Sequence, residues 1–259
     1  MKQIAIVITA LVCIVANGCK HKIEGPSAVS PTTLFSQMPS SITGIDFSNQ
    51  IQYTEEYNPY TFRNFFNGSG VGLGDINNDG LIDVFFCANM ESNRLYLNKG
   101  NFQFEDITQK AGLSTKNVWS SGVAMVDING DGLLDIYVCK SGKPEGNRRY
   151  NELFINNGDL TFTEKAAEYG LADLGLSSHA AFFDYDRDGD LDCYLLNNSI
   201  KSVGGYDLVK GQRNIRDKKG GNKLYRNEGN KFVDVSENAG IYGSKIDFGL
   251  GVTIGDVNR

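Results

Sequence analysis

The sequence predicts an all-β protein built from four-stranded repeats, and three features of the chain support this prediction. An acidic loop motif recurs along the chain, an Asn-x-Gly turn follows each complete copy, and apolar runs rich in strand-forming residues flank both features. Four-stranded units that repeat about every 50 residues are typical of β-propeller blades or of a β-solenoid.

The acidic motif has the pattern Asp-x-Asn/Asp-x-Asp-Gly-x-x-Asp and occurs in full over residues 75–83, 127–135 and 184–192. A shorter match begins at Asp256. Alternate oxygen-bearing side chains, with a glycine where the backbone turns sharply, suit a hard cation such as calcium better than magnesium, which retains more water. We therefore expect about three Ca²⁺ ions, one for each complete loop.

Positions one, three, five and nine of each loop would supply side-chain oxygens, and position seven a main-chain carbonyl oxygen. In the third loop, Asp190 would contribute its main chain only. The predicted ligands are Asp75, Asn77, Asp79, Leu81 and Asp83; Asp127, Asn129, Asp131, Leu133 and Asp135; and Asp184, Asp186, Asp188, Asp190 and Asp192. We expect a structural role for the ions, because several carboxylates within one hairpin repel one another.

Two other kinds of acidic loop share parts of this pattern. An EF-hand requires flanking helices and a glutamate at position twelve, which here is Phe86, Val138 or Leu195. Simple acidic β-turns would explain one copy, but three copies in the same register favour a metal site.

A second repeated feature is the Asn-x-Gly turn with its flanking apolar residues, over 95–104, 153–162 and 224–232. Each unit then comprises a strand, the acidic loop, a strand, a variable loop, a strand, the Asn-x-Gly turn and a strand. We predict blades at about 67–110, 118–168 and 177–238, with a partial blade over 247–259. Small residues in the first strands, as in 70–74 and 249–255, favour a propeller, in which innermost strands are crowded.

The predicted blades form an incomplete ring of about three and a half, whereas closed propellers have roughly four to eight. We therefore expect the chain to be the N-terminal part of a longer protein.

The N-terminus has the features of an export signal. Lys2 precedes an apolar run over 4–16 that is too short for a membrane span, so residues 1–18 are predicted to be a signal peptide. The following Cys19 resembles the lipidated residue of a bacterial lipoprotein, and 19–41 would be a tether. This predicts a protein attached to the outer membrane or cell surface only through lipid; a plain secretory signal is the alternative.

The repeated motifs resemble a known family. The acidic loops, the stretch over 64–71 and the Ala-Gly-Leu ending at 111–113 are similar to the FG-GAP/VCBS-type repeats of the ASPIC/UnbV and cartilage-acidic-protein group. The resemblance covers about residues 42–259. It implies an integrin-α-like β-propeller, calcium in the blade loops and an extracellular or cell-surface setting, but it implies no particular ligand.

Composition argues against a nucleic-acid partner, because the formal charge is −6 and the acidic residues are concentrated in the loops. The sequence contains no nucleophile elbow, His-Glu-x-x-His motif or phosphate-binding loop. We therefore expect a binding or adhesion module rather than an enzyme. The alternative is the substrate-recognition part of a larger secreted metal-assisted hydrolase.

Two insertions between the second and third strands, at 140–150 and 199–221, are rich in Lys and Arg. Long loops on a rigid scaffold often carry function, and basic ones suit an acidic glycan or protein. The candidate ligand face consists of Arg148, Arg149, Arg213, Arg216, Lys218 and Lys219. The alternative is that both loops are simply solvated.

The remaining side chains of interest are interpreted as packing residues. We predict Cys87, Cys139 and Cys193 to be buried free thiols, since their number is odd and their spacing irregular. The aromatic residues over 53–66 and Trp119 are expected to pack near the first blades, and His179 to lie packed within an inner strand.

Overall fold

The computed structural model describes residues 34–114, 119–142, 149–199, 211 and 214–257. The chain divides into two units, residues 1–38 and 39–259, and every helix and strand described here lies in the second unit.

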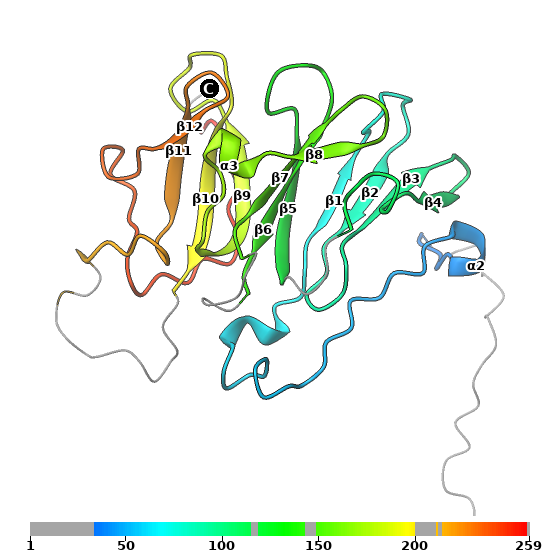
Figure 1. Cartoon of the computed structure of the whole chain (residues 1–259), viewed down its shortest axis with the longest axis horizontal. Coiled ribbons are helices and arrows are strands. Elements are labelled where there is room, and N and C mark those ends of the chain that lie inside the picture. The colour runs from blue at the N-terminus through cyan, green and yellow to red at the C-terminus, as the bar shows by residue number, and fades with distance from the viewer. Residues whose placement is uncertain (1–33, 115–118, 143–148, 200–210, 212–213, 258–259) are drawn as a thin grey trace, which may run out of the picture. The chain divides into compact units, whose positions relative to one another are not determined.

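Three antiparallel four-stranded sheets follow one another along the chain (Figure 1), and in each the strands lie in sequence order. The first sheet comprises β1 (Val71–Gly74), β2 (Asp83–Phe86), β3 (Arg94–Asn98) and β4 (Phe104–Asp106). The second comprises β5 (Ser120–Val126), β6 (Asp135–Lys140), β7 (Glu152–Asn156) and β8 (Phe162–Glu164). The third comprises β9 (Leu176–Phe183), β10 (Asp192–Asn198), β11 (Lys223–Asn227) and β12 (Phe232–Asp234). The predicted all-β fold of four-stranded repeats is thus confirmed, and the described residues form no closed ring.

The first strands of successive sheets lie against one another, because β5 contacts both β1 and β9. A Cβ added to Gly70 would lie 3.0 Å from the Cα of Gly122, and one added to Gly122 would overlap the carbonyl oxygen of Ser178. The Ser178 hydroxyl in turn donates to the carbonyl of Gly249 at 3.2 Å. Small residues therefore occupy the positions where neighbouring backbones approach most closely.

The hydrophobic core is divided between the sheets. One cluster joins the first and second sheets and includes Phe85, Leu95 and Ile136. Another joins the second and third sheets and includes Tyr137, Leu153 and Leu195. Each sheet therefore buries both faces only when a neighbour packs on it, as repeat architectures require.

Three short helical turns accompany the sheets: α2 (Ser40–Thr43), the 3-10 helix η1 (Arg63–Phe66) and α3 (Ala166–Tyr169). The segment that contains η1 packs as predicted, since Phe62, Phe65 and Trp119 form a buried cluster against which Tyr57 packs. Three other aromatic residues of the segment are largely exposed, by contrast: Tyr53 (69%), Tyr60 (95%) and Phe66 (64%).

The three cysteines that the structure describes, Cys87, Cys139 and Cys193, are free and buried, as predicted. Residues 247–257, where the sequence predicts the start of a fourth blade, contain no regular strand. One isolated antiparallel bridge joins Phe248 to Asn198 of β10. In each of the three sheets the first strand pairs with the second strand. Among the described residues, no second strand pairs with residues 249–257.

Candidate metal centre

Each acidic loop joins the first and second strands of its sheet and is organised by its first aspartate. The Gly80 amide donates to Asp75 Oδ2 at 2.7 Å, and the corresponding bond from Gly132 to Asp127 is 2.9 Å long. The Gly189 amide donates to Asp184 at 3.1 Å. These three glycines have φ values of 84°, 87° and 99°. This is a left-handed backbone conformation that residues other than glycine rarely adopt. The sequence pattern therefore specifies the same turn three times.

The third loop brings three carboxylates together. One oxygen from each of Asp184, Asp186 and Asp188 lies within 4.8 Å of the others, and all three side chains are exposed. Like charges this close repel one another, and a cation lying among them would offset that repulsion. Oxygen donors at this spacing are the ligands that calcium prefers, so this donor set fits the expected ion.

The first and second loops differ because position three is an asparagine. The Asn77 side-chain amide donates to Asp79 Oδ2 at 3.0 Å, and that of Asn129 donates to Asp131 Oδ2 at 2.9 Å. The amide of residue seven, Leu81 or Leu133, donates to the same position-five carboxylate at 2.8 and 2.9 Å. In the third loop the Asp190 amide donates to Asp188 at 3.2 Å. Metal coordination by the position-seven carbonyls stays a prediction.

The position-nine aspartates have a role that the sequence analysis missed. Asp83, Asp135 and Asp192 are fully buried, with exposed fractions of 0%. Asp135 Oδ2 accepts from the Ile128 amide at 3.1 Å, and Oδ1 accepts from the Asn156 amide at 2.8 Å.

Asp83 and Asp192 make the equivalent pairs of bonds to Ile76 and Asn98 and to Tyr185 and Asn227. Each position-nine carboxylate thus ties its loop to the third strand. Its assignment as a calcium ligand stays a prediction, and Asp192 lies outside the three-carboxylate group of the third loop.

A signal for this bond was present in the sequence, because the asparagine of every Asn-x-Gly turn supplies the second amide. Its side chain also reaches the residue before position nine. Asn98 donates to the Ile82 carbonyl at 2.8 Å, and Asn156 donates to the Leu134 carbonyl at 3.2 Å. The aspartate and the asparagine recur together because their hydrogen bonds join the second strand of each sheet to its third strand.

Burial makes ionisation of these aspartates costly. Desolvation raises the pKa of Asp135 to about 6, although its amide hydrogen bonds act in the opposite direction. Desolvation likewise raises the pKa of Asp83 and of Asp192. In the third loop, desolvation and then the charge of Asp188 raise the pKa of Asp190. A bound cation would favour the ionised form in every case.

Neighbouring loops also touch. The Asn78 side chain in the first loop donates to the Gly132 carbonyl in the second loop at 3.0 Å. The acidic loops of the first two sheets therefore form a continuous surface.

The structure changes the interpretation of the candidate basic face. Arg148 and Arg213 lie outside the described residues. Arg149 is buried and donates to the Leu174 carbonyl, so it is not available to a partner.

Arg216 donates to the Ile241 carbonyl at 3.1 Å and lies 3.9 Å from the Asp234 carboxylate. It therefore holds two loops together. Lys218 and Lys219 are exposed. Lys140, at the start of the first basic insertion, is 1% exposed and pairs with Glu152 at 2.7 Å. Position in a basic insertion did not predict exposure, because a buried cation is tolerated where an acceptor or a counter-charge meets it.

Comparison with known proteins agrees with this geometry. The model of the FG-GAP-like repeat family matches residues 75–138 and 143–195. These two matches include all three acidic loops. Residues 75–138 and 143–195 therefore match FG-GAP-like repeats. The predicted resemblance is therefore confirmed.

Cartilage acidic protein 1 from three vertebrates is similar to this chain. The Xenopus tropicalis protein is 29% identical over 130 residues, which cover 50% of this chain and 20% of that protein. The mouse protein is 28% identical over 143 residues (55% and 22%), and the human protein 27% over 144 residues (55% and 21%). The matched region thus spans about a fifth of the length of these curated relatives.

The described part of the chain contains no helix long and apolar enough to cross a membrane. The predicted signal peptide and Cys19 lie outside the described residues.

Proposed function

We propose that this FG-GAP-repeat chain is a calcium-stabilised β-propeller module that is exported and binds an extracellular glycan or protein. The observation that carries the proposal is the repeated loop geometry, with three exposed carboxylates converging in the third loop. Convergent oxygen donors suit a cation, and three loops that share the same glycine turn suit one ion each.

The calcium part of the proposal is tested by thermal unfolding of the full chain in a chelator and in millimolar calcium. A ligand that binds only the folded state stabilises it by about 2.7 kcal/mol at a hundred times its dissociation constant. We therefore expect the melting temperature to rise by several degrees with calcium and by less with magnesium. Equal melting temperatures in calcium and chelator would overturn the proposal.

A matched pair of variants assigns the effect to the third loop. Asp186→Asn and Asp188→Asn together should reduce the calcium-dependent rise, because two of the three converging carboxylates lose their charge. Glu91→Gln and Glu237→Gln together remove two negative charges at other exposed positions and should leave the rise unchanged. An equal loss in both variants would mean that net charge, rather than the site, determines the effect.

We also propose that the chain is exported and held at the bacterial outer membrane or cell surface by lipid on Cys19. The support is the predicted signal peptide followed by a cysteine in a lipoprotein-like setting. Cys19→Ser should move the protein from the membrane fraction to the soluble exported fraction. Unchanged fractionation would contradict the lipid anchor.

A further inference from the structure

A cavity of about 340 Å³ lies where the first strands of the three sheets begin. Ser121 lies near the start of β5, Ser178 near the start of β9, and Gly68 shortly before β1. The acidic loops follow the opposite ends of these strands. The cavity therefore opens at the end of the inner strands that is remote from the candidate metal centre.

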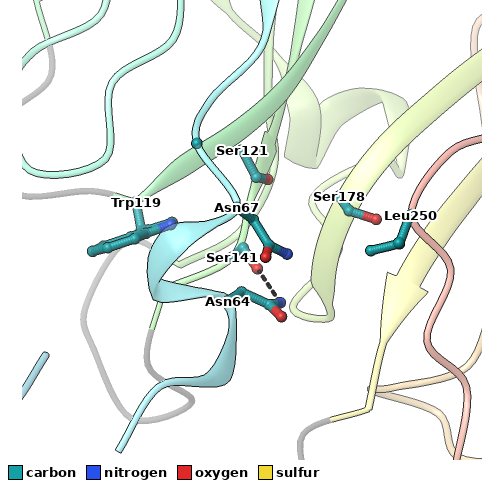
Figure 2. Close-up of a pocket in the computed structure, with 8 residues that line it drawn as sticks. Asn64, Asn67, Trp119, Ser121, Ser141, Ser178 and Leu250 are labelled. Atoms are coloured by element: carbon teal, nitrogen blue, oxygen red, sulfur yellow. Dashed lines mark hydrogen bonds between the residues drawn. The ribbon is translucent and has the colours of Figure 1, made fainter. Parts of the chain in front are cut away.

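The side chains around this cavity are neutral hydrogen-bonding groups (Figure 2). They comprise two carboxamides, three hydroxyls and two apolar groups: Asn64, Asn67, Ser121, Ser141, Ser178, Trp119 and Leu250. None of the described residues that line the cavity carries a charge. A charged ligand would lose its hydration here without gaining a counter-charge, which makes a neutral polar ligand the better fit.

Several of these groups retain hydrogen-bonding capacity. Asn67 is exposed, and its side chain makes no hydrogen bond with the described residues, so both its donors and its acceptor are available. The Asn64 carboxamide meets the Ser141 hydroxyl only at 3.5 Å, a weak contact (Figure 2). The Ser121 hydroxyl donates its hydrogen to the Ser177 carbonyl at 2.5 Å or to the Cys139 carbonyl at 3.0 Å, and its oxygen remains able to accept.

Apolar surface complements the polar groups. Leu250 is 81% exposed, and Trp119 lines the cavity while its ring packs against Phe62 and Phe65. Pockets of roughly 300–1,000 Å³ with a few placed polar groups are typical of small-molecule sites. Alternating hydroxyls and apolar C–H faces are the surface of a sugar ring.

We propose that this cavity binds a neutral saccharide unit. Asn64 and Asn67 would donate to and accept from sugar hydroxyls, the serine hydroxyls would accept from them, and Leu250 would cover an apolar ring face. The inference rests on the proposed binding function and names its ligand class. It also places the ligand apart from Lys218 and Lys219, the exposed remainder of the predicted basic face.

The chain supplies its own reporter for this site, because Trp119 is the only tryptophan in the sequence. The full chain is titrated in calcium with methyl glycosides of glucose, galactose and mannose and with N-acetylglucosamine. Glucuronate and heparin serve as acidic probes. We expect a saturable change in tryptophan emission with at least one neutral sugar, and saturation-transfer NMR signals from the same sugar.

Asn67→Ala should weaken that binding about fivefold, the effect of losing one to two neutral hydrogen bonds. Because Asn67 is exposed, the variant should keep the wild-type melting temperature. Ser178→Ala tests the opposite wall of the cavity and should weaken binding similarly. Gln109→Ala, an exposed amide that does not line the cavity, is the matched control and should bind as the wild type does.

Absence of any saturable response to the neutral sugars would overturn the inference, as would responses to glucuronate or heparin alone. Unchanged affinity in both Asn67→Ala and Ser178→Ala would also overturn it. A calcium-dependent rise in melting temperature without sugar binding would refute this inference alone. Sugar binding without any calcium effect would refute the calcium proposal and leave the saccharide site supported.

Discussion

Replacing Asp135 by alanine should destabilise the protein even when no calcium is present. The buried carboxylate accepts main-chain amides of Ile128 and Asn156, and alanine would leave both amides without a partner. Hydrogen bonds to a charged group contribute about 1.5–3 kcal/mol each, so the two together contribute about 3–6 kcal/mol. Burial raises the pKa of Asp135 to about 6, which shows that desolvation offsets part of this contribution. We expect a net loss of about 2–4 kcal/mol.

The assay is thermal unfolding in excess chelator, where a loss of about 2–4 kcal/mol should lower the melting temperature by roughly 5–15 °C for a chain of this size. Asp135→Asn preserves volume and one acceptor oxygen, so it should fall between the wild type and the alanine variant. Asp131→Ala is the control, because Asp131 is exposed and should matter mainly when calcium is present. If Asp135→Ala melted within a degree of the wild type in chelator, or lost stability only with calcium, the buried carboxylate would have no structural role of its own.

Three other perturbations test the packing of the sheets. Lys140→Met alone should lower the free energy of unfolding by about 3–5 kcal/mol, because the Glu152 charge would be left buried and unpaired. Adding Glu152→Leu should restore most of this stability. Equal chemical denaturation midpoints for the single and double variants would contradict the prediction. Gly122→Ala should destabilise by about 1–3 kcal/mol or more, because the added methyl would overlap the Ser178 carbonyl; an unchanged midpoint would show that the inner strands can separate. Burial lowers the pKa of His179 below its ordinary value of 6.5, so the neutral form favours folding and the stability should fall as the pH decreases below about 6.5. A melting curve series against pH should have a smaller slope for His179→Asn, and equal slopes would refute this assignment.

The repeat and the fold class could be predicted from the sequence because they depend on local residue chemistry. A glycine is required where φ is positive in the acidic loops, and an Asn-x-Gly turn is required between the third and fourth strands, so both recur as short motifs. The burial of Cys87, Cys139 and Cys193 could also be predicted, since Cys139 and Cys193 lie in apolar strands and Cys87 directly follows one.

Features that depend on contacts between distant strands could not be predicted from local motifs. The pattern assigns position nine to a metal ligand, but only the folded sheet brings Asp135 against the amide of Asn156, 21 residues away. Arg149 and Lys140 look exposed in a polar insertion, yet each finds a partner, Leu174 or Glu152, that no local pattern indicates. The saccharide cavity has no motif at all, because its residues come from the starts of several strands.

The segment before the first sheet shows how one repeat rule extends beyond the motifs. In the second and third sheets, the turn that ends the preceding unit packs on the outermost strand. A Cβ at Gly112 would lie 3.5 Å from the Phe162 carbonyl oxygen, and one at Gly170 would lie 2.5 Å from that of Phe232. Gly44 has the same left-handed conformation and the same 2.5 Å relation to the Phe104 carbonyl oxygen.

Residues 39–46 therefore occupy, on the first sheet, the place that a blade-ending turn occupies on the others. The helical turn α2 ends at a left-handed Gly44, as α3 ends at Gly170. Asp46 then accepts from the hydroxyl of the buried Tyr96 at 3.0 Å, and Asp173 accepts from the hydroxyl of Tyr225 at 2.8 Å. In each sheet such a turn covers the outermost strand. For the first sheet no earlier repeat is present among the described residues, and residues 39–46 supply the turn instead.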